Sequence, residues 1–525
     1  MVNQCLNCGA GLRYDIASAS LKCDHCDSFF SPDEYDRQTD ATEEMTVFTC
    51  PNCGANITGN DEDAVDYCMY CGSFVTLRSH IAKLRTPDGI IPFKKTKDEC
   101  ISIYKRMIMR KLYAPKEFRD ESFLKSFRGA YIPYWIYEAS YGPDIHFYGS
   151  SSSQKGDYVV TQHYTIKADV EGEIGGIIYD ASSSFDDSIN ASLAPYDSRE
   201  VKPYNPAYMF GFFADTADVN EDLFLKDAEK AANDEAWRIV SSDKQVRAGH
   251  PNKPGTPEKF DTYFKPAVSS KLALLPVWFL TFRKGDRVAY SAVNGETGAI
   301  YSEVPIDPIR YILISLITAI PLFLLLNMNF TFLGPQMVAG TLLLSVLMVF
   351  LYMVQIENII RRTFRADDRG FLSVHKKEEE FVKQKISSNI LISGVKWLLD
   401  FMKFDKSEGI YGFLGAFAVV VFALSISVNV LAVVFIFVVP VYVLYRIVKC
   451  SKLLEDKTVY FDVAGAMIAT VVCALTLIID PASDYFYYGA AIVCILATTV
   501  TAALTIRRYN QLITRPIPRW EEVSE

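Results

Sequence analysis

Cysteine shows the clearest chemical pattern in this sequence, because eight of its 12 cysteines stand in four Cys-x-x-Cys pairs near the N-terminus. Within each half of the pattern, fourteen residues separate the two pairs. The second half has the same spacing and is offset from the first by 45 residues. Four thiolates complete a tetrahedral structural zinc site and leave no position for water or substrate. The cysteines are therefore predicted to bind two structural Zn²⁺ ions, one through Cys5, Cys8, Cys23 and Cys26 and the other through Cys50, Cys53, Cys68 and Cys71.

Glycine follows three of the four pairs, at Gly9, Gly54 and Gly72, where a tight turn favours a residue without a side chain. Each ribbon is too short to bury a core, so metal binding is predicted to supply most of its folding free energy, on the order of 10–16 kcal/mol. His25 lies inside one pair and is predicted to be a surface residue. Reduced thiols indicate a cytosolic compartment, and the first twenty residues contain no visible signal peptide.

Charge in the ribbon segment argues against nucleic acid as a partner. Residues 1–80 contain thirteen acidic residues and only four basic ones. Nucleic-acid phosphates are bound by basic patches that release counterions. The ribbons are therefore predicted to bind protein rather than DNA or RNA.

No catalytic constellation is visible in the chain. It contains no Gly-rich phosphate loop, no His-Glu-x-x-His and no Gly-x-Ser-x-Gly. A group of aspartates near Ser182–Ser184 matches no calcium-binding loop and is predicted to form a solvated surface: Asp180, Asp186, Asp187, Asp197, Asp215 and Asp218. The sequence predicts a protein that is not an enzyme.

Residues 90–305 are predicted to form a soluble α+β domain. Its periodic segments are 97–112 and 221–239 as helices, 157–168 and 173–179 as strands, and 288–304 as a hairpin. Two Pro-x-Trp segments, at 133–135 and 276–278, stand inside apolar runs. We interpret them as core strands whose tryptophans fill volume, and a duplicated ligand pocket is the alternative.

Residues 308–525 are predicted to form a membrane domain. Six uncharged segments are long enough to cross a bilayer: 311–328, 337–356, 410–427, 429–445, 463–479 and 488–506. The predicted fold class is therefore multidomain, with two small zinc ribbons (1–80), an α+β soluble domain (90–305) and an α-helical polytopic membrane domain of about six spans (308–525).

Basic residues give the predicted orientation of these spans. Lysine and arginine gather after the second span, after the fourth span and in the C-terminal tail, whereas the opposite connections contain none. Because positive residues stay on the cytoplasmic side, we expect a multi-pass plasma-membrane protein with both termini in the cytoplasm. A cytoplasmic amphipathic loop at 357–409 is expected to lie in the membrane interface or, as the alternative, to pack on the soluble domain.

The first 305 residues resemble bacterial membrane-anchored tandem zinc-ribbon proteins, also described as TFIIB-type zinc-ribbon-containing proteins. The resemblance depends on the two ribbons and on five later motifs: IIPFK at 90–94, AYIPYWIYE at 130–138, PAYMFGFFAD at 206–215, LLPVWFL at 274–280 and AVNGETG at 292–298. It implies zinc binding by the eight cysteines and an adaptor role beside SPFH-domain or phage-shock-type membrane-stress proteins. The six predicted spans exceed those of simpler members.

The function expected from these features is that of a non-enzymatic membrane scaffold that recruits cytoplasmic or membrane proteins through its zinc ribbons. One alternative is a transporter or channel-like regulator gated by the ribbon head. The predicted span interiors contain no acidic or basic residue, which favours an anchor over an ion-coupled carrier. A nucleic-acid-binding protein is the second alternative, against which the acidic ribbons argue.

Overall fold

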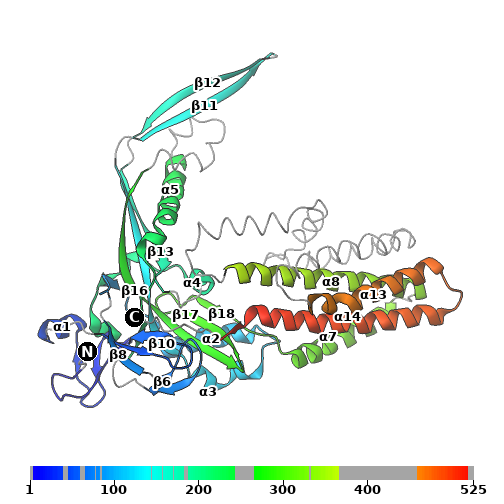
Figure 1. Ribbon diagram of the computed structural model, residues 1–525, viewed down its shortest axis with the longest axis horizontal. Coiled ribbons are helices and arrows are strands. Elements are labelled where there is room, and N and C mark those ends of the chain that lie inside the picture. The colour runs from blue at the N-terminus through cyan, green and yellow to red at the C-terminus, as the bar shows by residue number, and fades with distance from the viewer. Residues whose placement is uncertain are drawn as a thin grey trace.

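A head of strands and short helices carries a bundle of long helices on one side (Figure 1). The computed structural model describes residues 4–517 except for these stretches: 40–44, 59–64, 77, 83–84, 143–144, 157, 169–170, 183–186, 243–264, 330–332 and 366–457. The head thus includes the ribbons and the predicted α+β region, and the bundle comes from the predicted membrane region.

The centre of the head is a 12-stranded sheet built around two long antiparallel neighbours, β10 (Arg128–Tyr141) and β16 (Ala267–Lys284). Nearly all of β10 and the middle of β16 are buried, which explains their continuous apolar sequences. The remaining strands of this sheet are β4 (Met45–Thr49), β5 (Asn56–Thr58), β8 (Arg78–Ala82), β9 (Gly89–Ile90), β13 (Gly172–Asp180), β14 (Lys202–Pro203), β15 (Phe213–Asp215), β17 (Arg287–Asn294), β18 (Ile300–Ser302) and β19 (Arg515–Pro516).

The two Pro-x-Trp segments lie on the paired strands β10 and β16 but are offset in register, since Trp135 is opposite Leu272 and Trp278 is opposite Gly129. The indole nitrogen of Trp135 donates a hydrogen bond to the Val219 carbonyl at 2.8 Å. That of Trp278 donates to the Lys95 carbonyl, also at 2.8 Å. Both tryptophans are buried, so the interpretation of the two segments as core strands is confirmed.

The predicted helices of the head are present with small shifts at their ends. α2 (Lys97–Met109) begins after Thr96, which forms a capping box with Glu99 and fixes the start of the helix. The second helix begins as a 3₁₀ turn capped by Asn220 and continues as α5 (Leu225–Ser242). The described part of the head also contains three shorter helices: α1 (Pro32–Thr39), α3 (Glu121–Leu124) and α4 (Asp187–Leu193).

The predicted hairpin at 288–304 is formed by β17 and β18. Its turn is closed by Asn294, whose side-chain oxygen accepts hydrogen bonds from the backbone N–H groups of Glu296 and Thr297 at 2.8 and 2.9 Å. Gly298 has a φ of +80°, which a residue without a Cβ adopts readily. The Asn-Gly-Glu-Thr-Gly motif is therefore explained by turn geometry.

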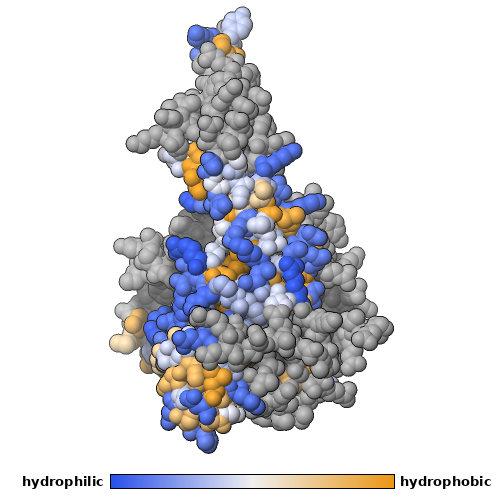
Figure 2. Space-filling model, turned by 90° about the vertical axis from the view of Figure 1, so that its left-hand side faces the viewer, coloured by the Kyte–Doolittle hydropathy of each residue, from blue (hydrophilic) through white to orange (hydrophobic). Residues whose placement is uncertain are grey.

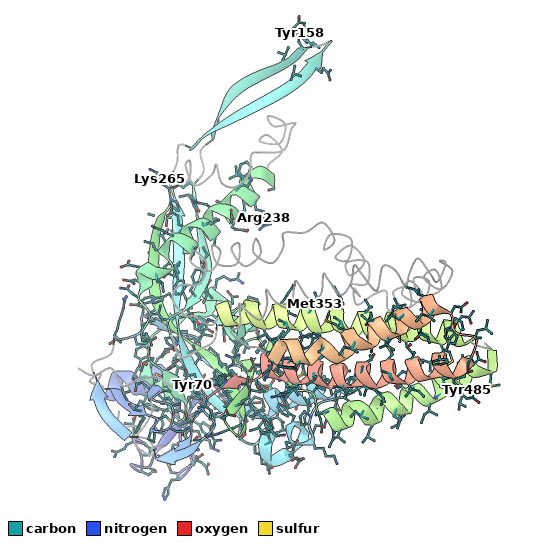
Figure 3. All side chains as sticks on the ribbon, turned by 45° about the vertical axis from the view of Figure 1, so that its right-hand side comes forward. Tyr70, Tyr158, Arg238, Lys265, Met353 and Tyr485 are labelled. Atoms are coloured by element: carbon teal, nitrogen blue, oxygen red, sulfur yellow. The ribbon has the colours of Figure 1, made fainter. Side chains whose placement is uncertain are left out.

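A second, much longer hairpin extends from the head (Figure 3). It is formed by β11 (Ile145–Lys155) and β12 (Tyr158–Ala168), which pair along their whole length. The predicted strands at 157–168 and 173–179 thus correspond to β12 and β13, whereas β11 was not predicted. Tyr158, at the tip, is 78% exposed.

Four helices are long and apolar enough to cross a membrane, among the residues that the structure describes. They are α7 (Pro308–Asn329), α8 (Gly334–Arg365), α13 (Thr458–Ile479) and α14 (Asp484–Ile513). They coincide with the first, second, fifth and sixth predicted spans, so the described residues contain four of the six. The predicted spans at 410–427 and 429–445, and most of the amphipathic loop at 357–409, lie outside the described residues.

α7, α8 and α14 each have one end at the head, and α13 has its N-terminal end toward the same side of the bundle (Figure 1). α7 leaves the head and α8 returns to it, and α13 and α14 repeat this course, so the described turns at 333 and 480–483 lie at the far end of the bundle. Tyr485 marks that far end in Figure 3. The basic C-terminal residues of α8 and α14 therefore share the side of the bundle on which the ribbons lie.

Candidate metal centres

The eight cysteines form two groups of four, as their spacing predicts. In each group the four sulfur atoms lie within 4.8 Å of one another. The Sγ–Sγ distances are 3.6 Å for Cys5–Cys26 and Cys8–Cys23, and 3.7 Å for Cys50–Cys71 and Cys53–Cys68. A tetrahedral ion with Zn–S bonds of about 2.3 Å separates its sulfurs by about 3.8 Å. Each group could therefore hold one metal ion, and four thiolates are the donor set of structural zinc.

The backbone makes the same turn at all four pairs. The residue after each pair has a positive φ: +74° at Gly9, +53° at Asp27, +80° at Gly54 and +66° at Gly72. Its N–H donates to the carbonyl of the first cysteine of the pair at 2.8–3.0 Å. Asp27 is the exception in residue type, and aspartate adopts this conformation more easily than most residues. The sequence predicted a tight turn at the three glycines. At the fourth pair Asp27 makes the same turn.

A side-chain hydrogen bond also recurs in both ribbons. Asn7 Nδ2 donates to Ser28 Oγ, and Asn52 Nδ2 donates to Ser73 Oγ, both at 2.9 Å. These residues are 45 positions apart in the sequence, like the cysteines themselves. The repeat therefore extends beyond the metal ligands, and the equal spacing of these Asn and Ser residues is a signal of it in the sequence.

The two centres differ in their access to solvent. In the second ribbon all four cysteines are buried, whereas Cys8 and Cys26 of the first ribbon are exposed. The exposed edge of the first ribbon also carries two large apolar side chains, Leu6 at 45% and Phe29 at 54% exposure. The first ribbon is thus the one whose metal-binding end faces outward.

The chain is similar to a protein of Bacillus subtilis (strain 168). That protein, the uncharacterised protein YdjG, is 27% identical over 313 residues, which cover 58% of this chain and 90% of the relative. The chain matches no family model, and no solved structure matches it. The likeness to YdjG therefore gives a distant relative without a described activity.

The second ribbon is joined to the sheet through buried polar groups. Tyr70, between Cys68 and Cys71, donates its hydroxyl hydrogen to the Asp215 carboxylate at the end of β15. Ser182 donates to the same oxygen of Asp215. Burial raises the pKa of Asp215 to about 7, although these hydroxyl donors act in the opposite direction. Asp215 is 4% exposed and Asp180 5%, so the prediction of a solvated surface is wrong for both.

β16 and β17 also contact the second ribbon. The Tyr290 hydroxyl donates to the Tyr70 carbonyl, and the Thr281 hydroxyl donates to the Met69 carbonyl. Arg283 donates to the Ser73 hydroxyl. In addition, β5 of this ribbon pairs with β15 of the sheet. The second centre is therefore a structural part of the sheet.

The segment that follows α14 contacts β17, one of these two strands. Arg515, in β19, donates to the Glu303 carboxylate and lies over the Tyr290 ring, 5.1 Å from its centroid. The Glu303 side chain is fully buried in this pair. Arg287 donates to the Gln511 carbonyl at 2.9 Å. Tyr290 thus contacts both the second ribbon and the C-terminal end of the membrane helices.

The first ribbon is attached to the head through Tyr14 and α1. The Tyr14 N–H donates to the Phe210 carbonyl at 2.9 Å, and the Tyr14 ring meets the Tyr208 ring edge-to-face with centroids 5.3 Å apart. Asn205 Nδ2 donates to the Pro32 carbonyl at 3.1 Å. These contacts cover the side of the ribbon away from Cys8 and Cys26. They also explain the PAYMFGFFAD motif, which forms the surface that receives the ribbon.

A buried ion pair joins three helices near the head end of the bundle. Arg508 of α14 donates to the Asp462 carboxylate of α13 at 2.7 Å, and Tyr352 of α8 donates to the same oxygen at 2.5 Å. Both charged residues lie just outside the predicted spans. Asp462 precedes the fifth span by one residue, and Arg508 follows the sixth span by two. The pair lies at the helix ends rather than near the bundle centre.

Proposed function

We propose that this protein is a non-enzymatic membrane scaffold whose head, containing two zinc ions, recruits partner proteins to the cytoplasmic face of the plasma membrane. The observation that carries the proposal is the difference between the ribbons. One centre is enclosed in the sheet, whereas the other exposes two of its cysteines together with Leu6 and Phe29. Exposed apolar side chains beside polar ones are typical of a protein-binding surface.

The position of the first ribbon agrees with this role. It lies on the side of the head away from the bundle (Figure 1). Figure 2 views the molecule from this side, where hydrophobic residues gather at the lower end among hydrophilic ones. A partner that approaches from the side opposite the membrane would meet this ribbon.

The proposed orientation places the head in the cytoplasm, where thiols stay reduced. The common position of the head and of the basic helix ends supports it, because positive residues stay on the cytoplasmic side. A thiol reagent unable to enter cells should leave the head unmodified in intact cells and modify it after lysis. Modification from outside would overturn the orientation.

Partner recruitment is tested with surface changes that leave the cysteines in place. Leu6→Ser with Phe29→Ser should retain zinc, measured by metal analysis, but lose specific partners in cross-linking and mass spectrometry of intact cells. Leu225→Ser with Ile239→Ser, on the exposed side of α5, is the matched control and should keep them. An unchanged set of cross-linked proteins in the ribbon variant would overturn the proposal. SPFH-domain and phage-shock-type proteins are the first candidates to look for.

The alternative is a regulator in which the head acts on the membrane helices. It is favoured by the contacts of Arg287 and Arg515, which join the end of α14 to the sheet that holds the second centre. This alternative predicts solute flux in proteoliposomes that changes when zinc is removed. If no flux is measured either with or without zinc, this alternative is rejected and the scaffold function is retained.

A further inference from the structure

A basic segment of the head lies where the first membrane helix begins. Residues 105–119, from the end of α2 to the following 3₁₀ turn, contain six basic residues and one acidic residue in a chain whose net charge is −9. The basic residues are Lys105, Arg106, Arg110, Lys111, Lys116 and Arg119. All six are exposed. We call this stretch the basic segment.

The basic segment is attached to the start of α7 by three contacts. The Asp307 N–H donates to the Tyr113 carbonyl at 2.8 Å, and Arg310 Nη1 donates to the Ala114 carbonyl at 2.8 Å. The Tyr113 and Tyr311 rings pack with centroids 5.1 Å apart. α2 and α3 accordingly lie on the side of the head from which α7 starts (Figure 1). The segment is therefore held at the depth where the chain enters the membrane.

Its apolar residues face solvent in the same place. Met109 is 66% and Leu112 58% exposed, and Ile309 at the start of α7 is 70% exposed. Apolar side chains next to lysine and arginine are the composition of surfaces that insert into the lipid headgroup region. Tyrosine is also enriched at this depth, because its ring is apolar and its hydroxyl polar.

The charges of the basic segment are largely uncompensated within the part of the chain that the structure describes. Lys105 lies 4.0 Å from Glu121, and Arg119 donates to the Lys111 carbonyl. Among the described residues, Arg106, Arg110, Lys111 and Lys116 make no ion pair. Their cationic groups are thus available to a negatively charged ligand.

We infer that the basic segment binds the headgroups of anionic phospholipids in the leaflet next to the head. The ligand is a lipid because the segment is fixed to a membrane helix and combines positive charge with exposed apolar side chains. An anionic surface attracts each nearby lysine or arginine by about 1 kcal/mol, which is about fivefold in affinity. This inference is independent of the recruited partner and of the orientation of the head.

The test uses the full-length protein in lipid nanodiscs of phosphatidylcholine, with or without phosphatidylglycerol. Hydrogen exchange measured by mass spectrometry should show slower exchange of residues 105–119 in the discs that contain phosphatidylglycerol. The variant with Arg106, Arg110, Lys111 and Lys116 all changed to Gln should lose this difference and retain at least about tenfold less phosphatidylglycerol. Added salt should weaken the effect in the wild type.

A matched control carries the same number of changes on exposed lysines elsewhere on the head. Lys155→Gln, Lys226→Gln, Lys230→Gln and Lys265→Gln should leave the lipid effect unchanged, since Lys155 lies in the long hairpin and Lys265 near it, away from the bundle (Figure 3). Equal exchange in both lipids, or an unaffected quadruple variant, would overturn the inference. So would protection by inorganic phosphate in discs of phosphatidylcholine alone, which would make the segment a site for soluble anions. None of these outcomes bears on partner recruitment by the first ribbon.

Discussion

Tyr70 donates its hydroxyl hydrogen to the buried carboxylate of Asp215, and this bond joins the second metal centre to the central sheet. The two residues are 145 positions apart in the sequence. Both are almost completely buried, so neither can exchange its partner for water. The enclosed centre and the sheet are therefore expected to fold as one unit.

Replacement of Tyr70 by phenylalanine should destabilise that unit. The change keeps the ring but removes one hydrogen-bond donor of a buried carboxylate, which costs about 1–3 kcal/mol. Thermal unfolding of the purified protein in detergent, followed by tryptophan fluorescence, should show a lower midpoint. Tyr158→Phe, at the exposed tip of the long hairpin, is the control and should leave the midpoint unchanged. Equal midpoints for both variants would contradict the role assigned to this bond.

The pKa of Asp215 gives the same unit a pH dependence. Burial raises this pKa from 3.8 to about 7, so the folded state holds a proton that the unfolded state has released. The free energy of unfolding should therefore fall as the pH rises, by about 1.4 kcal/mol between pH 6 and pH 8.

Asp215→Asn removes this titration and is the variant that isolates it. Between pH 6 and pH 8 the unfolding free energy of this variant should fall by about 1.4 kcal/mol less than that of the wild type. Working above pH 6 limits the loss of metal through protonation of the thiolates. A wild type and variant with parallel pH profiles would show that Asp215 ionises at its ordinary pKa.

The elements with local signals were the ones that could be predicted. The cysteine spacing gave both metal centres, and the cap at Thr96 and the turn at Asn294 set the ends of α2 and the β17–β18 hairpin. The four described membrane helices followed from length and hydropathy. Each of these depends on residues that are close in the sequence.

What could not be predicted depends on residues that are far apart. Asp215 was predicted to lie on a solvated surface, because no neighbour in the sequence shows that a tyrosine 145 residues away will cover it. Similarly, the pairing of β19 with β17 joins residues more than 200 positions apart. The strand β11 is rich in serine and lacks the alternation that marks a strand. These features depend on pairing between residues far apart in the chain, and a single sequence does not show which distant residues pair.

The two centres should release metal at different rates. Cys8 and Cys26 are exposed, whereas all four cysteines of the second centre are buried, so a chelator reaches the first ion more easily. Zinc release to a chromogenic chelator should occur in two phases of equal amplitude. Cys8→Ser should remove the fast phase alone, and Cys53→Ser should remove the slow phase. A single phase that both variants reduce equally would show that the centres are equivalent.

The contact between Arg515 and Glu303 should hold the end of α14 against the sheet. Arg515→Ala leaves the carboxylate of Glu303 buried without its cationic partner, which costs about 3–5 kcal/mol. Hydrogen exchange of β17 should become faster, because β19 pairs with that strand through Arg515 and Pro516. Arg507→Ala, at an exposed position of α14, controls for the loss of one positive charge, and Arg515→Lys should restore part of the protection. Unchanged exchange of β17 in Arg515→Ala would mean that the helix end is held to the head by its other contacts, such as those of Arg287.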